Sequence, residues 1–182
     1  QAGDHVVAAG ALYGGSVTLL AVSLAKFGIE TTFVDAHNPQ AFAAAMRPHT
    51  RAVYAESLCN PSMVVLDIAA VAEVAHAHGV PLIIDNTVPS PLLCNPLALG
   101  ADIVVHSATK FIGGHGTSIG GVVVDSGTFD WTNGKFPGLV EPDPSYHGMR
   151  FVEAFGPLAY LLKLRTQFLR DVGPAPSPFN TW

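Results

Sequence analysis

The stretches PLIIDNT (residues 81–87) and ADIVVHSATK (residues 101–110) decide the fold of this chain. Each is an apolar run that ends in polar residues, with Asp85 closing the first run and Lys110 the second. Strands that are apolar throughout are typical of a parallel sheet covered on both faces. Because an unpaired charge is costly inside such a sheet, and because ligands bind at the carboxyl ends of its strands, we predict that both charged residues belong to a ligand site.

Strands and helices alternate outward from these two runs. Apolar, β-branched runs predict further strands over residues 5–9, 29–35, 51–57 and 121–125. Helical periodicity with capping residues predicts helices over residues 15–28, 38–46, 67–79 and 155–173, and the Gly- and Pro-rich residues 127–148 predict a long loop. The pattern predicts an α/β fold whose mainly parallel sheet carries helices on both faces.

Composition excludes several classes of protein. The 182 residues are 49% hydrophobic and 13% charged, with a net charge of −5, which disfavours disorder and argues against a nucleic-acid partner or an anionic membrane. No apolar stretch reaches the length of a membrane span. Cys59 and Cys94 are the two cysteines, too few for a disulfide framework or a zinc quartet, so we expect a reducing, cytoplasmic location.

The residue types around Lys110 indicate a particular chemistry. A lysine at the end of a buried strand can have a lowered amine pKa, as Schiff-base chemistry requires, although a lysine that simply reaches solvent is commoner. Ser107 and Thr109 offer hydroxyls to an anionic group, and Asp85 offers an acid to a cationic ring nitrogen. Together these groups suit pyridoxal phosphate, with its aldehyde, phosphate and pyridinium nitrogen.

Two further residues lie on the predicted ligand side of the sheet. Tyr13, in ALYGGS, sits between a strand and a helix, where its ring could stack on a flat cofactor or simply pack. Asn60, in SLCNP, follows another strand, and a turn-forming asparagine is the simpler explanation there.

Other chemistries fit less well. The GTSIG at residues 116–120 matches the G-x-S-x-G pattern of hydrolases, but that motif needs a strand before the serine and a helix after it, whereas a strand follows here. His76 and His78 are two apart on a predicted helix and face different ways, and His106 and His115 lack an accompanying ligand set. We predict no metal site.

Several segments in this order resemble the Cys/Met-metabolism family of pyridoxal-phosphate enzymes, the cystathionine γ-synthase-like group of fold type I. The matching pieces are YGGS (13–16), ESLCNP (56–61), residues 67–91, residues 96–121 and SPFN (177–180). The resemblance implies that Lys110 holds the cofactor as a Schiff base and shuttles protons, and that Asp85 keeps the pyridine nitrogen protonated. Ser107 and Thr109 would bind the phosphate.

The same resemblance implies roles for three residues around the ring. Tyr13 would stack on it and assist proton transfers, Asn60 would donate to its phenolic oxygen, and Thr87 would lie on the face opposite Tyr13. Within the family, residues 106–125, FDW (129–131) and EPDPSYHG (141–148) are most similar to O-acetylhomoserine sulfhydrylases.

That branch implies a reaction in methionine and cysteine biosynthesis, in which O-acetylhomoserine and sulfide give homocysteine and acetate. We expect the loop at residues 141–148 to line the pocket mouth, which would suit a nucleophile as small as sulfide. A sibling cystathionine γ-synthase or γ-lyase is the alternative, and a non-catalytic scaffold is a third.

Members of this family have much longer chains. Residues 1–173 are therefore expected to form a cofactor-binding large domain that is incomplete at its N-terminus, and residues 174–182 to begin a connection toward a C-terminal domain. The resemblance also implies a homo-oligomer, a tetramer built from dimers, because an arm of one subunit completes the phosphate site of its neighbour.

Overall fold

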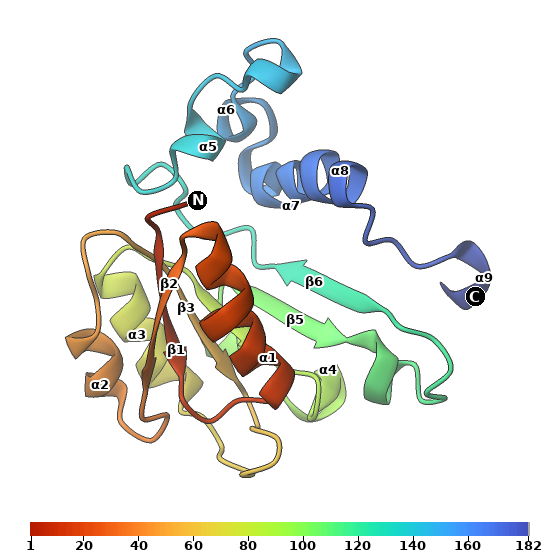
Figure 1. Ribbon diagram of the computed structural model, residues 1–182. Helices are drawn as coiled ribbons and strands as arrows, with labels where there is room; N and C mark the ends of the chain where they lie inside the picture. Colours follow the sequence, from red (N-terminus) through yellow and green to blue (C-terminus); the bar gives the residue numbers. More distant parts are fainter. Residues whose placement is uncertain (182) are drawn as a thin grey trace.

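A computed structural model describes residues 1–181 and has one six-stranded sheet in the order β2-β1-β3-β4-β5-β6 (Figure 1). The first five strands are parallel, and β6 runs antiparallel to β5. This arrangement confirms the predicted mainly parallel sheet. The strands are β1 (His5–Ala9), β2 (Glu30–Val34), β3 (Thr50–Glu56), β4 (Leu82–Asp85), β5 (Ile103–Ser107) and β6 (Gly121–Asp125).

Capping residues begin and end the crossover helices where the sequence indicates. Asn38 accepts a hydrogen bond from the backbone N–H of Gln40 at 3.0 Å, and Asp67 accepts one from Ala70 at 3.1 Å. Gly28 ends the first helix with a φ of 75°, a left-handed conformation that glycine adopts without strain. These helices are α1 (Gly14–Thr18, continued by η1, Leu19–Ser23, and η2, Leu24–Phe27), α2 (Pro39–Ala44) and α3 (Ile68–Ala77).

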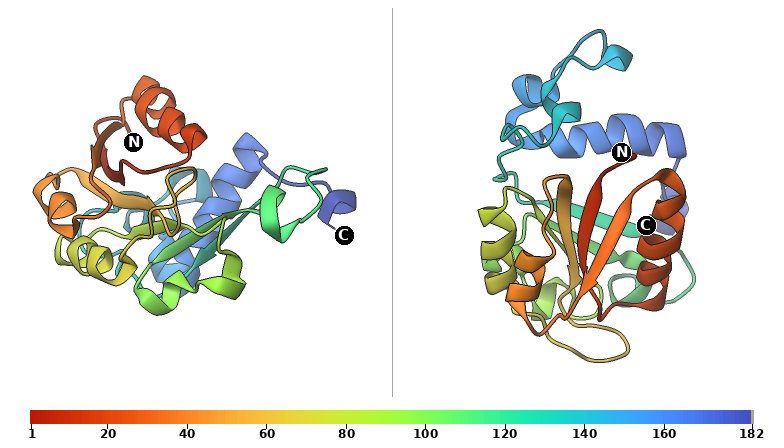
Figure 2. Two further views of the ribbon diagram at one scale, coloured as in Figure 1. Left: turned by 90° about the horizontal axis from the view of Figure 1, so that it is seen from below. Right: turned by 60° about the vertical axis from the view of Figure 1, so that its left-hand side comes forward.

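Helices cover both faces of the sheet. Helix α1 lies on one face and helices α2 and α3 on the other (Figure 2). Between the sheet and α2 and α3 lies the main core, with fully buried Phe42, Val53, Val71, Leu82 and Ile84. Burying such side chains contributes about 1.5–3 kcal/mol each, and this is the driving force that keeps the strands in register.

Residues 127–148 are predicted from the sequence to form a long loop. They instead contain short helical turns and pack as a cap with a hydrophobic cluster of its own. Its aromatic side chains pack together, and the rings of Trp131 and Tyr160 stack with centroids 5.1 Å apart. The Gly and Pro content obscured this packing, because aromatic clustering leaves no periodic signal. From residue 137 to residue 181 the chain forms short helical segments, of which the first two lie within the cap: α5 (Pro137–Val140), η5 (Pro144–Tyr146), α6 (Phe151–Phe155), η6 (Gly156–Leu158), α7 (Ala159–Lys163), η7 (Leu164–Leu169), α8 (Arg170–Val172) and α9 (Pro178–Thr181).

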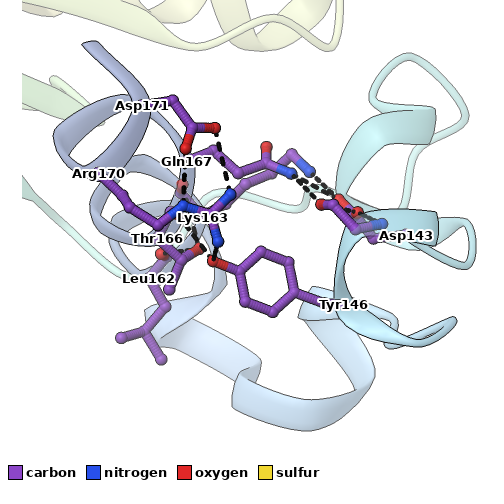
Figure 3. A network of polar contacts seen from close by, with 9 residues as sticks. Asp143, Tyr146, Leu162, Lys163, Thr166, Gln167, Arg170 and Asp171 are labelled. Carbon is purple, nitrogen blue, oxygen red and sulfur yellow. Dashed lines mark hydrogen bonds and ion pairs between the residues drawn. The ribbon is translucent and has the colours of Figure 1, made fainter.

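A polar network fixes residues 141–148 against this helical segment (Figure 3). The buried carboxylate of Asp143 accepts hydrogen bonds from Lys163 Nζ and Gln167 Nε2, both at 2.8 Å. The Lys163 ammonium, helped by Ser145, holds the pKa of Asp143 well below its usual range. Tyr146 adds a hydrogen bond from its hydroxyl to the carbonyl of Thr166 at 2.8 Å. The loop is therefore anchored to the helix from α7 to α8.

The strand order reverses between β1 and β3. The chain leaves β1 toward β2 on one side, and every later crossover runs toward the other side, to β3, β4 and β5. Loops that leave neighbouring strands in opposite directions open a crevice at the carboxyl edge of the sheet, and this is where ligands bind in such folds. No helix within residues 1–181 is both long and apolar enough to cross a bilayer.

Candidate active site

A cavity of about 580 Å³ lies at the carboxyl ends of the strands. It brings together all seven residues singled out from the sequence, which come from four separate segments: Tyr13, Asn60, Asp85, Thr87, Ser107, Thr109 and Lys110. Residues up to 97 positions apart in the chain thus meet because parallel strands place their carboxyl ends at one edge. This convergence at the carboxyl edge is the arrangement that the strand-end pattern predicts.

Lys110 occupies a different local structure from the one predicted. Strand β5 ends at Ser107, and Lys110 lies beyond it in the turn η4 (Ala108–Ile112), with exposed surface and a non-helical backbone at φ −93° and ψ −120°. The turn is closed by the N–H of Gly113, which donates to the carbonyl of Ala108 at 2.8 Å. An added Cβ at Gly113 would lie 2.5 Å from that carbonyl oxygen, so the glycine is required for the turn that presents the lysine.

Asp85 is held in place by a short chain of hydrogen bonds between two strands. Its Oδ1 accepts from the backbone N–H of Thr87 at 2.9 Å and from the Thr87 hydroxyl at 2.5 Å. The same hydroxyl oxygen accepts from the backbone N–H of Ser107 at 2.8 Å. Thr87 therefore ties the acid on β4 to the segment on β5 that leads to the lysine.

A partly buried tyrosine approaches the other oxygen of this acid. The hydroxyl of Tyr54 lies 3.4 Å from Asp85 Oδ2. Burial, reinforced by the negative charge of Asp85, raises the pKa of Tyr54. The tyrosine therefore stays neutral and can donate its proton in a hydrogen bond to the carboxylate.

Two supporting residues were not identified from the sequence. Asn86 is fully buried, and its Nδ2 donates to the carbonyls of Ser90 and Cys94 at 3.0 and 2.9 Å. Its Oδ1 accepts from Ser57 Oγ at 2.7 Å, so it fixes the turn that follows Asp85. Glu56 is also buried and lines the cavity beside Asp85. The available signals were that Asn86 directly follows Asp85 and that Glu56 is an acid near the end of a predicted strand.

The remaining candidates lie at the rim. Thr109 Oγ1 donates to the carbonyl of Gly120 at 3.2 Å and accepts from its N–H at 3.0 Å, so this hydroxyl also anchors the glycine-rich loop. Tyr13 caps helix α1 and is 53% exposed. Its ring lies over Gly15, where an added Cβ would come within 2.7 Å of Cε1. Gly15, two residues after Tyr13, therefore makes room for the ring.

The histidines take structural positions. His106 is buried and its Nδ1 lies 3.1 Å from the carbonyl of Asn86, while exposed His115 contacts the carbonyl of Gly113. His76 Nε2 lies within hydrogen-bond distance of Asp102 Oδ2, at 2.9 Å. Across residues 1–181 no cluster of three or more His, Cys, Asp or Glu side chains is arranged to hold a metal ion. After the GTSIG sequence comes strand β6, so the serine does not sit on a strand-to-helix elbow.

These side chains define a class of site. An amine, a carboxylate held by two donors from one threonine, hydroxyls at the next strand end and an aromatic ring border a single cavity. This donor set fits a flat, phosphorylated pyridine aldehyde, so the protein is of the class that carries such a cofactor on an α/β sheet.

Comparison with known proteins defines the family. Residues 1–182 match the family described as Cys/Met metabolism PLP-dependent enzyme, and the chain belongs to it. It is 56% identical to O-acetyl-L-homoserine sulfhydrylase of Leptospira meyeri, over all of this chain and 43% of that protein.

Solved structures agree with this assignment. A Campylobacter jejuni structure that contains N'-pyridoxyl-lysine-5'-monophosphate superimposes with a TM-score of 0.95 at 33% identity, covering 100% of this chain and 45% of that one. O-acetylhomoserine sulfhydrylase of Wolinella succinogenes superimposes with a TM-score of 0.83 at 39% identity, covering 99% and 48%. The chain spans less than half the length of these relatives.

We predict that replacing Thr87 with valine weakens binding of pyridoxal phosphate by the full-length protein roughly ten- to a hundredfold, because a hydrogen bond to a charged group contributes about 1.5–3 kcal/mol. Valine keeps the branched shape of threonine but removes the hydroxyl between Asp85 and Ser107. Titration followed by visible absorbance measures the affinity. Thr87→Ser, which retains the hydroxyl, is the control, and an unchanged affinity in Thr87→Val would show that the link is dispensable.

Proposed function

We propose that this chain is the cofactor domain of an O-acetylhomoserine sulfhydrylase acting in methionine biosynthesis. Its reaction joins O-acetylhomoserine and sulfide to give homocysteine and acetate. The observation that carries the proposal is the meeting of Lys110 and Asp85 in one cavity, in a chain 56% identical to a sulfhydrylase. A cytoplasmic location is proposed with it, supported by two free cysteines, Cys59 and Cys94.

Pyridoxal phosphate, when bound, supplies an electron sink that makes protons near the substrate amino group acidic. In the proposed mechanism Lys110 Nζ would hold the cofactor through its aldehyde, and the same amine, when free, would move protons between substrate carbons. Its exposed position in η4 gives it the freedom for both tasks. Asp85, fixed by Thr87, holds a proton on the ring nitrogen.

The other cavity residues bind and orient the cofactor in this proposal. Ser107 donates a hydroxyl hydrogen bond to its phosphate, and Thr109 does so by exchanging its bond to the Gly120 carbonyl for one to the phosphate. The amide side chain of Asn60 donates to the phenolic oxygen of the ring. Tyr13 stacks on one face of the ring, and Thr87 lies near the other. All five residues line the cavity, which supports these roles.

The substrate thiol is not decided by the loop at residues 141–148. The expectation that this loop lines the pocket mouth is wrong for this chain, because it is bound to Lys163 and Gln167 and contributes no residue to the cavity. Sulfide is instead supported by the relatives' activities. A cystathionine γ-synthase or γ-lyase would use the same cofactor residues and remains the second candidate.

Replacing Lys110 with alanine should abolish turnover in the full-length enzyme while leaving the thermal unfolding midpoint close to that of the wild type. The amine both carries the cofactor and moves protons, and its exposure means that the fold does not depend on it. Turnover and circular dichroism measure the two effects. Lys26→Ala, at another exposed lysine, is the control, and near-normal turnover by Lys110→Ala would refute the assignment.

Substrate choice is tested by assaying the full-length enzyme with O-acetylhomoserine and either sulfide or cysteine. We expect homocysteine formation from sulfide to be faster than cystathionine formation from cysteine. Replacing O-acetylhomoserine by O-succinylhomoserine should lower kcat/KM. Preferred formation of cystathionine would move the assignment to the γ-synthase.

A homo-oligomer, specifically a tetramer, is part of the proposal. Two exposed apolar side chains on the segment between β5 and β6 support it: Phe111, which lines the cavity, is 68% exposed, and Ile119 is 87% exposed. A contact with another subunit would remove both side chains from water. Sedimentation of the full-length protein should show a tetramer, and Ile119→Asp should shift it toward smaller species. A fully active wild-type monomer would contradict this.

A further inference from the structure

Glu56 poses a physical problem that the cofactor chemistry does not explain. It is the last residue of β3, pairs in register with Asp85 on β4, and is 7% exposed. Registered residues on neighbouring parallel strands point to the same face, so two acids lie side by side in a site that needs only one. Burial, opposed by two backbone hydrogen bonds and reinforced by the charge of Asp85, raises the pKa of Glu56.

The partners of Glu56 are backbone groups. Within residues 1–181 no Lys, Arg or His side chain forms an ion pair with it. Instead Oε1 accepts from the backbone N–H of Tyr13 at 2.8 Å, and Oε2 accepts from the backbone N–H of Asn60 at 3.3 Å. Each oxygen therefore holds one of the two loops that carry proposed ring contacts.

The two hydrogen bonds of Glu56 connect loops that leave the sheet in opposite directions. The loop with Tyr13 follows β1 toward α1, and the loop with Asn60 follows β3 toward α3, on the opposite face of the sheet (Figure 2). The ladder between β1 and β3 ends before either residue, with Ala8 opposite Tyr54 as its last pair. Beyond that pair a direct link is needed to set how far apart the two loops stand.

We infer that Glu56 is a positioning residue of the cofactor site, a carboxylate clamp that sets the separation of Tyr13 and Asn60 across the crevice. The clamp would determine how the Tyr13 ring stacks on the face of the cofactor ring and how the Asn60 amide reaches its phenolic oxygen. This inference rests on the proposed function, which assigns both side chains to the cofactor. It assigns no proton transfer to Glu56 and no contact with the substrate.

Two substitutions separate the features of the clamp. Glu56→Gln keeps the size but replaces one acceptor oxygen by a donor, so one of the two backbone N–H groups loses its partner. Glu56→Asp keeps both oxygens and the charge but shortens the reach by one methylene. Glu73→Gln, at an exposed glutamate on α3, is the matched control for the change in charge.

The clamp itself is tested without cofactor. Hydrogen exchange resolved to single amides, in the cofactor-free full-length protein, should be about tenfold faster at Tyr13 or Asn60 in Glu56→Gln, because one hydrogen bond is lost. Amides inside β1 and β3 should be unaffected. Unchanged exchange at both Tyr13 and Asn60 would show that no clamp exists, whatever the protein does with a cofactor.

Positioning is tested with the cofactor bound. Visible circular dichroism per bound cofactor reports the asymmetry of its surroundings, and we expect it to change about twofold or more in Glu56→Gln, with an affinity loss of about tenfold. The absorbance band should persist, since Lys110 is untouched, and kcat should fall more than KM rises. Glu56→Asp should show the same changes to a smaller degree.

The outcomes distinguish the inference from the proposed function. Faster exchange with unaltered dichroism and affinity would leave a clamp that does not position the cofactor, and the inference would be wrong. A wild-type protein that shows no visible band at all would refute the proposed function instead. If Glu56→Gln fails to fold, Glu56→Asp carries both measurements, and wild-type values in that variant would also overturn the inference.

Discussion

A parallel sheet must be covered on both faces, and this constraint governs the rest of the structure. It requires a helix after nearly every strand, so the apolar strand residues, such as Val53 and Ile84, are sealed on one side by α2 and α3. It also places every carboxyl end of β1 to β5 at one edge. Polar side chains that would be costly inside the sheet gather at that edge, where the reversal of strand order opens a crevice for them.

The two acids at this edge, Asp85 and Glu56, are hydrogen-bonded by backbone N–H groups and a hydroxyl. Among the described residues neither acid forms an ion pair. Asp85 accepts from the N–H and hydroxyl of Thr87, and Glu56 accepts from two loop N–H groups. The neutral hydroxyl of Tyr54 lies near the first acid. Fixed donors of this kind stabilise carboxylates without neutralising them. Within residues 1–181, Lys110 lines the same cavity but forms no ion pair with either acid.

Local signals in the sequence were enough to predict the elements but not the links between them. Strand β1 and the caps Asn38 and Asp67 follow from residue type and spacing, and the site location follows from strand ends. The links from Thr87 to Ser107 and from Glu56 to Tyr13 join residues 20 and 43 positions apart. The periodicity of apolar residues along the sequence does not predict such contacts, because they depend on how neighbouring strands are paired. The aromatic cap over residues 127–148 was missed for the same reason.

The antiparallel direction of β6 has a consequence for how the chain tolerates changes in length. Because β6 starts opposite Ser107, the residues between must turn back within the rim of the cavity, and Thr109 and Gly120 close that turn. An insertion or deletion between residues 108 and 120 would rotate or displace the segment that presents Lys110. The stretch at 127–148 lies at the far end of the sheet, so a change in its length would disturb the aromatic cap but not the segment that presents Lys110. The two glycine-rich segments look alike in composition, yet only one is under this geometric restriction.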